Sequence, residues 1–597
     1  MHPHAFLRRL PLAAAVLLAA CAPTRSTPSG AVTAPPVEAA TPAQAAYDRF
    51  ARDFLDWHYA DDPVRATRLG IHAHDHRLPD LTRAGIERRT RELHGWLDRL
   101  QAIDRARLSA DASIDHRILD HAIRARILEL EEVRGWQRNP GVYNAVAAGA
   151  VASLASREFA PLPVRLEAMI ARFDSLPALL AAGRANLDGS PHLWIRQAIA
   201  DTRGTSRYLQ TDLPAALRVQ GLDALDAELV RRWSTAGGRA AAELERFAAW
   251  LETDLLQRDT VGDFRLGRGL FERKLRYEEH VDLSADELRA INERAVADYQ
   301  AWVAREAARI DPRRTPAAVM DSLARQHPTA AELLPTARRQ LDEIRRFVVQ
   351  RGIVTLPSER MPVVRESPPY ARSGFASMDA PGPLETVATE AFYNITNVDP
   401  RWSGEQQEQH LTYFNHAGLL GITVHEAIPG HFVQLLYRPQ IATEVRRVFQ
   451  PTSLVEGWAH YAEQMMVDEG LGGGDPAVRL GQLRRALQRH ARWDAGLAMH
   501  AFGDSVAGAA RRFERIAFFA PFPALRETER GTSDPTYLYY ALGRMQILKL
   551  REDYRRHLES QGRTFSLREF HDRFLRLGLP VSLAREVMMP GDTGTSL

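Results

Sequence analysis

The sequence predicts a mainly α-helical protein with one small β element. From Ala46 to about residue 350, apolar residues recur at three- and four-residue spacing, the period of amphipathic helices. Three short β-rich segments then follow, MPVVRE, SGFASM and AFYNITNV, separated by clusters of proline and glycine. Helical patterns resume near Glu405 and continue to the end of the chain. A small sheet or ribbon, with 391–397 as a strand, is therefore expected just before the second helical region.

The composition excludes several classes of protein. The chain has 597 residues, of which 45% are hydrophobic and 25% charged, as is typical of soluble globular proteins. A formal net charge of +2 gives no overall field to attract nucleic acid, so no nucleic-acid partner is expected. The single cysteine, Cys21, excludes a disulfide framework, a thiolate zinc site and an iron–sulfur cluster. A metal in this protein would need His, Asp or Glu ligands.

The first 45 residues predict export and anchoring. Two arginines precede an apolar run of secretory length, residues 10–20, which is too short to span a bilayer. The run ends in Leu-Ala-Ala-Cys, which resembles the lipobox of bacterial lipoproteins, whose cysteine is acylated. We expect 1–20 to be a signal peptide, Cys21 the lipid anchor to the membrane, and 21–45 a flexible tether rich in Pro, Thr and Ala. The resemblance implies a cell-envelope location, at the outer membrane or periplasmic face; an ordinary signal peptide is the alternative.

The remainder divides into two predicted parts with different content. Residues 46–350 form a helical half, in which Ser284 and Glu287 begin one segment with the S-x-x-E pattern of a capping box. We find no fixed-period repeat there, and nothing in this half requires a functional site. The residue types that carry chemistry lie in 351–597.

Two neighbouring motifs contain the candidates for a metal site. LGITVHEAIPGHFVQLLY carries His425, Glu426 and His431, and SLVEGWAHYAEQMM adds Glu456. A catalytic zinc takes about three nitrogen or oxygen ligands and keeps one position open for water. It also needs a carboxylate that takes the proton of the attacking water. His425, His431 and Glu456 would bind one zinc ion (Zn²⁺), with Glu426 as the general base; cobalt or manganese at the same ligands stays open.

The spacing of the two histidines predicts a distortion of the helix. His425 and His431 are six residues apart, whereas the histidines of the H-E-x-x-H motif are four apart. At about 100° per residue, six residues place the two side chains about 120° apart on a regular helix. Pro429 removes an amide donor and Gly430 permits unusual backbone angles. The sequence therefore predicts a bulge or break at 428–430 that turns His431 back toward the metal.

HEAIPGHFVQ followed by LVEGWAHYAEQ resembles the bacterial family DUF885, whose signature is HExxPGHxxQ plus EGWAxYxE. PLETVATEAFYNITNVDPRWS and DPTYLYYALGRMQILKLRE match as well, so the resemblance is specific over about 370–550. The family looks like a gluzincin-type zinc metallopeptidase. This implies a large helical, cleft-containing, metallopeptidase-like fold, with the small β element beside the active-site helices and 46–350 walling the cleft. It also implies His425, His431 and Glu456 as ligands and Glu426 as the base.

Two residues downstream of Glu456 are alternative ligands. His460 lies one helical turn beyond Glu456 and Glu463 two turns beyond, on the same face. Either could replace Glu456 as the third ligand, or could orient a ligand from the second coordination sphere. Glu456 is preferred because a glutamate on a second, downstream helix is the gluzincin arrangement.

Peptide hydrolysis builds negative charge on the carbonyl oxygen, which a nearby donor stabilises. Tyr540 matches a family tyrosine and is the first candidate for this catalytic role. His500 is the second, although the position four residues before it, acidic in the family, is Gly496 here. A packed aromatic ring and an ordinary histidine are the alternatives. The 391–397 strand is also expected to offer a free edge to an extended peptide, the alternative being an ordinary strand.

The sequence thus predicts a lipid-anchored zinc metallopeptidase that cleaves short or unfolded peptides by attack of zinc-bound water, with Glu426 as general base. Two alternatives stay open. One is a zinc amidase or other hydrolase acting on a non-peptide or cell-wall substrate. The other is a non-catalytic envelope lipoprotein with a structural metal site.

Overall fold

A computed structural model describes residues 41–259, 262–368, 372 and 374–597 of the chain. The predicted signal peptide, Cys21 and most of the predicted tether lie outside these residues. Helix α1 (Pro42–Asp61) begins inside the stretch predicted to be tether, so that prediction is wrong for 42–45. The reason is local, because the Thr41 side chain accepts a hydrogen bond from the amide of Gln44 and Pro42 occupies the first turn, where no amide partner is needed.

The predicted mainly α-helical fold is confirmed. Helices fill the chain up to residue 351: α1, α2 (Pro63–Leu69), α3 (Arg83–Gln101), α4 (Ala110–Leu128), α5 (Gly135–Arg138), α6 (Gly141–Ser156), α7 (Leu162–Asn186), α8 (His192–Gln210), α9 (Asp212–Val219), α10 (Ala227–Thr253), α11 (Arg268–Glu279), α12 (Ala285–Ile310), α13 (Pro316–Ala324) and α14 (Leu333–Arg351). Short turns of helix connect some elements: η1 (Arg105–Arg107), η2 (Glu129–Val133), η3 (Leu222–Ala224), η4 (Leu255–Gln257) and η6 (Arg438–Gln440). The capping box predicted at Ser284 and Glu287 begins α12, with both of its hydrogen bonds present.

The three β-rich segments form one small sheet. Strands β1 (Val363–Glu366), β2 (Ala376–Asp379) and β3 (Phe392–Ile395) lie in the order β1-β3-β2, with β1 parallel and β2 antiparallel to β3. Tyr393 is opposite Val364 on one side and Met378 on the other. The expectation that 391–397 offers a free edge is therefore wrong. β3 is the most buried of the three strands, and both of its edges are already paired.

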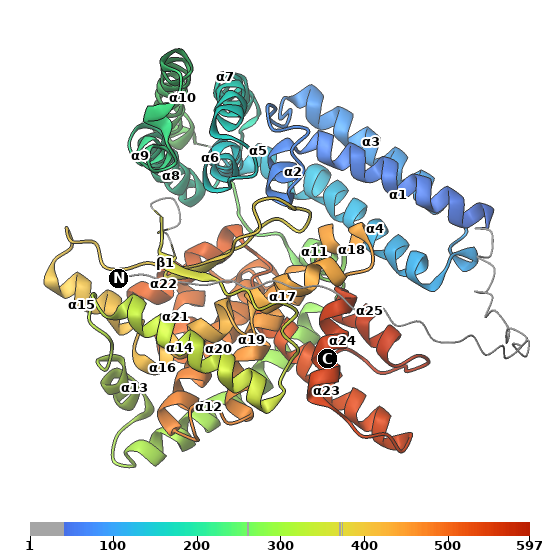
Figure 1. The fold of residues 1–597 in the computed structure, drawn as a ribbon, viewed down its shortest axis with the longest axis vertical. Coiled ribbons are helices and arrows are strands. Elements are labelled where there is room, and N and C mark those ends of the chain that lie inside the picture. Colours follow the sequence, from blue (N-terminus) through green and yellow to red (C-terminus); the bar gives the residue numbers. More distant parts are fainter. Residues whose placement is uncertain (1–40, 260–261, 369–371, 373) are drawn as a thin grey trace, which may run out of the picture.

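The rest of the chain is again helical: α15 (Gly404–Thr412), α16 (His416–Glu426), α17 (His431–Tyr437), α18 (Glu444–Val448), α19 (Thr452–Asp468), α20 (Pro476–His500), α21 (Val506–Ala517), α22 (Pro521–Ser533), α23 (Tyr539–Ser560), α24 (Leu567–Leu577) and α25 (Val581–Met588). In Figure 1 the N-terminal helices α1–α10 form an upper layer over a body that contains α12–α25, with β1 near the junction. No described helix has the length and apolar character needed to cross a bilayer.

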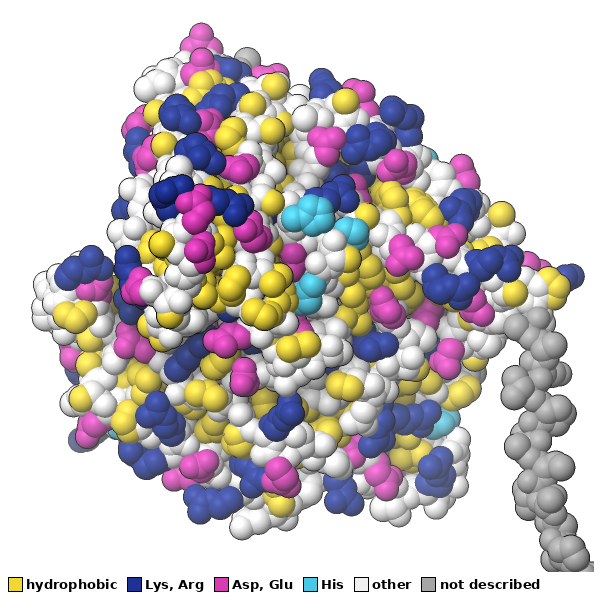
Figure 2. Space-filling model, turned by 45° about the horizontal axis from the view of Figure 1, so that its top comes forward, with side chains coloured by type: hydrophobic (Ala, Val, Ile, Leu, Met, Phe, Trp, Pro, Cys, Tyr) yellow, Lys and Arg dark blue, Asp and Glu magenta, His cyan; other side chains and the backbone are white. Residues whose placement is uncertain are grey.

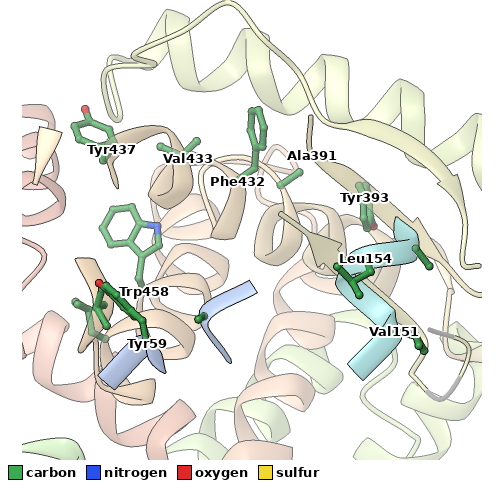
Figure 3. Packing of buried hydrophobic residues seen from close by; sticks show 14 of the residues in the cluster. Tyr59, Val151, Leu154, Ala391, Tyr393, Phe432, Val433, Tyr437 and Trp458 are labelled. Carbon is green, nitrogen blue, oxygen red and sulfur yellow. The ribbon is translucent and has the colours of Figure 1, made fainter. Parts of the chain in front are cut away.

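One large hydrophobic core joins the two layers. It includes Tyr59 of α1 and Leu154 of α6 together with Phe432 of α17 and Trp458 of α19. Figure 3 shows these side chains among the members of the cluster, together with Tyr393 of β3. A buried ion pair between Arg446 of α18 and Asp115 of α4, with N and O atoms 2.6 Å apart, adds a second connection. The helices that carry the predicted metal ligands thus rest on the N-terminal layer. The division at residue 350 and the cleft stay predictions.

The molecular surface has no large field of one sign on the face drawn in Figure 2. Basic and acidic side chains are interspersed there, with small apolar patches between them. This agrees with the near-zero net charge of the sequence.

Candidate metal centre

The predicted break between the two histidines is confirmed. α16 ends at Glu426, Ala427 leaves helical geometry with φ −107° and ψ −93°, and α17 begins at His431. The Ile428–Pro429 peptide is cis. The amide of Gly430 bonds back to the carbonyl of Val424 at 3.0 Å, which folds the chain sharply between the helices.

Gly430 is required in this break by a close approach of two backbone segments. A Cβ atom at Gly430 would lie 1.9 Å from the carbonyl oxygen of His425 and 2.4 Å from that of Val424. No side chain fits there, so only glycine allows the backbone to return this close. The indole nitrogen of Trp458, from α19, donates to the carbonyl oxygens of Pro429 at 2.9 Å and Gly430 at 3.3 Å. These bonds attach the break to the helix that carries Glu456.

The break brings His425, His431 and Glu456 together. One nitrogen of each histidine and one oxygen of Glu456 all lie within 4.8 Å of one another. The Nε2 atoms of His425 and His431 lie 3.4 and 3.5 Å from Oε2 of Glu456. The two imidazole rings are nearly perpendicular, with centroids 4.8 Å apart. Among the described residues this is the one group of three His, Cys, Asp or Glu side chains with metal-ligand spacing.

The donor atoms of this group fit a divalent metal. Oε2 of Glu456 is buried and has no hydrogen-bond partner among the described residues. A buried carboxylate oxygen without a hydrogen bond is costly, and a bound cation would remove that cost. Two imidazole nitrogens and one carboxylate oxygen are the ligand types of catalytic zinc. The three side chains could therefore hold one zinc ion, with Glu456 on α19 completing the pair from α16 and α17.

Glu463 holds the far side of the His425 ring. Its Oε1 lies 2.7 Å from Nδ1 of His425, which leaves Nε2 to face Glu456. Burial would lower the pKa of His425, but its interactions with Glu456 and Glu463 outweigh it and raise the pKa to about 9. Burial would raise the pKa of Glu456, but the histidines, His431 first, outweigh it and lower the pKa. Both effects show how strongly the carboxylates and imidazoles interact.

Glu463 is in turn held by two arginines of α20. Arg485 donates to both carboxylate oxygens at 2.7 and 3.0 Å, and Arg489 approaches Oε1 at 3.4 Å. Burial alone would raise the pKa of Glu463, but Arg485 and Arg489 outweigh it and keep the pKa well below its usual value. Glu463 therefore stays ionised beside His425. Its place is that of a residue that orients a ligand. The group with metal-ligand spacing contains Glu456 and not Glu463, and the choice of Glu456 as third ligand stays a prediction.

His460 lies behind this group and does not enter it. The side chain is completely buried, and neither ring nitrogen makes a hydrogen bond within the described part of the chain. Its Nδ1 is 3.4 Å from Oε1 of Glu463. Burial and the nearby charge of Arg544 lower the pKa of His460 well below its usual value, so the ring is neutral.

Glu426, the predicted base, is half-buried at the end of α16, next to His425 in the chain. Its carboxylate makes no hydrogen bond or ion pair with any residue that the structure describes. Its charge is among the causes that raise the pKa of His425, so it lies within electrostatic reach of the group.

Tyr540, in the first turn of α23, lies within electrostatic reach of Glu456. Glycines bring the two helices into direct contact, because a Cβ at Gly457 would lie 2.5 Å from the Cα of Gly543. Tyr540 lies one turn before Gly543 on α23, and Glu456 directly precedes Gly457 on α19. Both residues are therefore near the point where the two helices touch. Burial first, and then the charge of Glu456, raise the pKa of Tyr540, which keeps its hydroxyl protonated as a donor.

His500 is not part of the group with metal-ligand spacing, and its role in stabilising the carbonyl oxygen stays a prediction. It ends α20 in a buried position, its Nε2 lies 2.8 Å from the carbonyl oxygen of Gly531, and its ring packs against Phe264 and Phe271. Burial lowers the pKa of His500 to about 4. The backbone at Gly496 lies close to Pro535, because an added Cβ there would be 2.9 Å from the carbonyl oxygen of Pro535.

Three supporting residues were missed from the sequence: Arg485, Arg489 and Trp458. The arginines lie in LRRALQRHARW, which reads as an ordinary charged helix. Their four-residue spacing was the one available signal that both point the same way. Trp458 sits inside the EGWAHY motif, two residues after Glu456, where its contact with the break could have been suspected.

Comparisons with known proteins show the family and the fold and leave the activity open. A candidate lipoprotein of unknown function from Shewanella oneidensis is 26% identical and superposes with a TM-score of 0.76 over 91% of this chain and 99% of its own. A candidate lipoprotein from Colwellia psychrerythraea has the same fold at 19% identity, with a TM-score of 0.75 over 91% of this chain and 98% of its own. No curated protein matches. Residues 63–588 match the model of the family described as "Bacterial protein of unknown function (DUF885)", and the chain therefore belongs to the DUF885 family.

Proposed function

We propose that this protein is a zinc-dependent hydrolase, most specifically a metallopeptidase that cleaves short or unfolded peptides. The observation that carries the proposal is the convergence of His425, His431 and Glu456 around the unpartnered Oε2 of Glu456. Glu426 supplies a free carboxylate beside that group, for which a purely structural metal site has no use. The resemblance to gluzincins supports the same assignment by analogy.

Each residue of the site has a distinct task in this reaction. A zinc ion held by the three ligands would polarise the scissile carbonyl and make a nearby water more acidic. Glu426 takes the proton of the attacking water and delivers it to the leaving amine. The Tyr540 hydroxyl donates to the carbonyl oxygen as negative charge develops there. Glu463, fixed by Arg485, keeps the His425 ring in the orientation that presents Nε2.

The location follows from the N-terminal sequence and the structural neighbours. The Leu-Ala-Ala-Cys sequence ending at Cys21 has the pattern of a lipoprotein signal, and both neighbours described above are candidate lipoproteins. We infer a lipid anchor at Cys21 that holds the enzyme at the cell envelope, on the outer-membrane or periplasmic face. Radiolabelled palmitate should enter the full chain, and Cys21→Ser should abolish this incorporation.

A fluorogenic peptide library, applied to the zinc-loaded protein and to Glu426→Gln, tests the activity. The proposal predicts cleavage that a chelator removes, and a loss of kcat by about 10²–10⁴ in Glu426→Gln without loss of zinc. Glu426→Asp serves as a control that keeps the carboxylate. Cleavage of no peptide, with turnover of other amides or cell-wall fragments, would favour the amidase alternative. Equal activity of Glu426→Gln and the unsubstituted enzyme would refute the mechanism.

A further inference from the structure

Three buried arginines lie on one face of α20, beside the candidate metal centre. Arg485, Arg489 and Arg492 are spaced by four and three residues, so they point the same way. Their side chains are only 11%, 7% and 10% exposed. Arginines buried to this degree are normally paired with carboxylates, because an unpaired buried charge is costly.

The carboxylates available to these arginines are one too few. Arg485 makes two hydrogen bonds to Glu463, at 2.7 and 3.0 Å, and Arg492 makes two to Glu527, both at 2.9 Å. Arg489 has a 3.4 Å contact with Glu463 and a 3.2 Å bond to the carbonyl oxygen of Arg485. Its Nε is buried without a partner. Among the described residues, Arg489 therefore has no carboxylate of its own, and the face carries one positive charge in excess.

This excess charge adjoins Tyr540. The Tyr540 ring centroid is 5.7 Å from the guanidinium carbon of Arg489 and 5.1 Å from that of Arg492. The glycine contact between α19 and α23 brings the helix of Tyr540 against the helix of Glu456. Nη1 of Arg492 has no hydrogen-bond partner among the described residues, although it is not one of the fully buried atoms. Tyr540 thus connects the arginines to the metal group.

We propose that Arg489 and Arg492, next to Tyr540, form a subsite for a carboxylate group of the substrate beside the bond that is cleaved. Guanidinium groups are the preferred partners of carboxylates in proteins. The carboxylate can be the free C-terminus of a peptide, which makes the enzyme an exopeptidase, or the side chain of an acidic residue. The proposal rests on the hydrolase function above and defines its substrate class.

The urea midpoints of Arg485→Met and Arg489→Met distinguish a subsite residue from a purely structural arginine. Arg485→Met strands Glu463 and should lower the urea midpoint clearly, because removal of one partner of a buried ion pair leaves an uncompensated charge. Arg489→Met strands no carboxylate, and should leave the midpoint unchanged or raise it. A drop in Arg489→Met as large as that in Arg485→Met would show that Arg489 is needed for folding.

The binding experiment uses calorimetric titration of zinc-loaded Glu426→Gln protein, which removes turnover. One pair of probes is N-acetyl-Ala-Ala and its C-terminal amide; the other is N-acetyl-Glu-Ala amide and its Gln counterpart. We expect one acidic probe to bind about tenfold or more tightly than its neutral match, the size of a charge-assisted hydrogen bond. The first pair identifies a C-terminal carboxylate and the second an acidic side chain.

The preference for the acid should disappear in the Glu426→Gln/Arg489→Met double variant and persist in Glu426→Gln/Arg484→Met. Arg484 is the matched control, since it lies on another face of α20, near the Phe519 ring. Equal binding of acid and amide, binding of neither, or a preference that survives Arg489→Met overturns the subsite. If the Glu426→Gln/Arg489→Met variant does not fold, the comparison of acidic and neutral probes on the Glu426→Gln protein still tests the subsite. Failure of the hydrolase proposal is seen separately, as turnover that does not depend on Glu426.

Discussion

Replacing Gly430 by alanine tests whether the backbone break sets the metal site. The added Cβ would lie 1.9 Å from the carbonyl oxygen of His425 and 2.4 Å from that of Val424. Both contacts are more than 0.5 Å below the 3.0 Å that real Cβ atoms respect, and both involve backbone that cannot rotate away. The chain at 424–431 must therefore move, and His431 follows Gly430 directly.

Two magnitudes follow for Gly430→Ala. Overpacking of a tight interior costs about 1–3 kcal/mol, so the free energy of unfolding of the metal-free protein should fall by this amount. A displaced His431 should weaken zinc binding by about 10–100-fold, the usual effect of disturbing the support of a ligand. Urea unfolding measures the first quantity and competition with a chromophoric chelator the second.

Gly95→Ala is the matched control for Gly430→Ala. Gly95 is exposed in α3, and a Cβ there meets no atom within 4 Å. Alanine should stabilise this helix by about 0.5–1 kcal/mol and leave zinc affinity unchanged. Zinc affinity of Gly430→Ala within twofold of the unsubstituted protein would show that the break does not position His431.

Three further predictions concern the surroundings of the site. Glu463→Gln leaves Arg485 without a partner and should lower the free energy of unfolding by about 3–5 kcal/mol. Part of this loss should be recovered in Glu463→Gln/Arg489→Met, and no recovery would contradict the charge excess on α20. Trp458→Phe removes the donor to Pro429 and Gly430 and should cost about 1–3 kcal/mol in urea unfolding, with a smaller loss of zinc affinity; an unchanged midpoint would contradict that anchor. Burial raises the pKa of Glu279 from 4.5 to about 7, against the opposing Ser453 bond, so the folded protein favours the protonated acid. The stability that this protonation contributes is fully present below about pH 4.5 and is lost as pH rises through 7. The free energy of unfolding should therefore fall by about 3 kcal/mol between pH 4.5 and 8, measured by urea unfolding, and Glu279→Gln should not show this fall.

The local features of the fold could be predicted from the sequence. Helical periodicity and capping at Ser284 were visible because they depend on residues close in the chain. The break at 428–430 could be predicted because two histidines six apart cannot share a helix face unless Pro429 and Gly430 distort it.

Features that depend on tertiary packing could not be predicted. β3 is central because both other strands pair with it, and strand order is not encoded in the pattern of any one strand. The role of Glu463 depends on α20 lying against α19, which brings Arg485 to it from 22 residues away. The contact of His500 with the carbonyl oxygen of Gly531 was not visible either, because a buried histidine and a catalytic one look alike in sequence.

The central claim is that His425, His431 and Glu456 bind one metal ion. The direct test is anomalous diffraction at the zinc edge from crystals of the zinc-loaded protein, with element analysis of the same sample. We expect one zinc per chain, and a single anomalous peak between Nε2 of His425, Nε2 of His431 and the Glu456 carboxylate, with Glu463 still on Nδ1 of His425. No peak at this position, or a zinc ligated by His460 or Glu463 in place of Glu456, would contradict it.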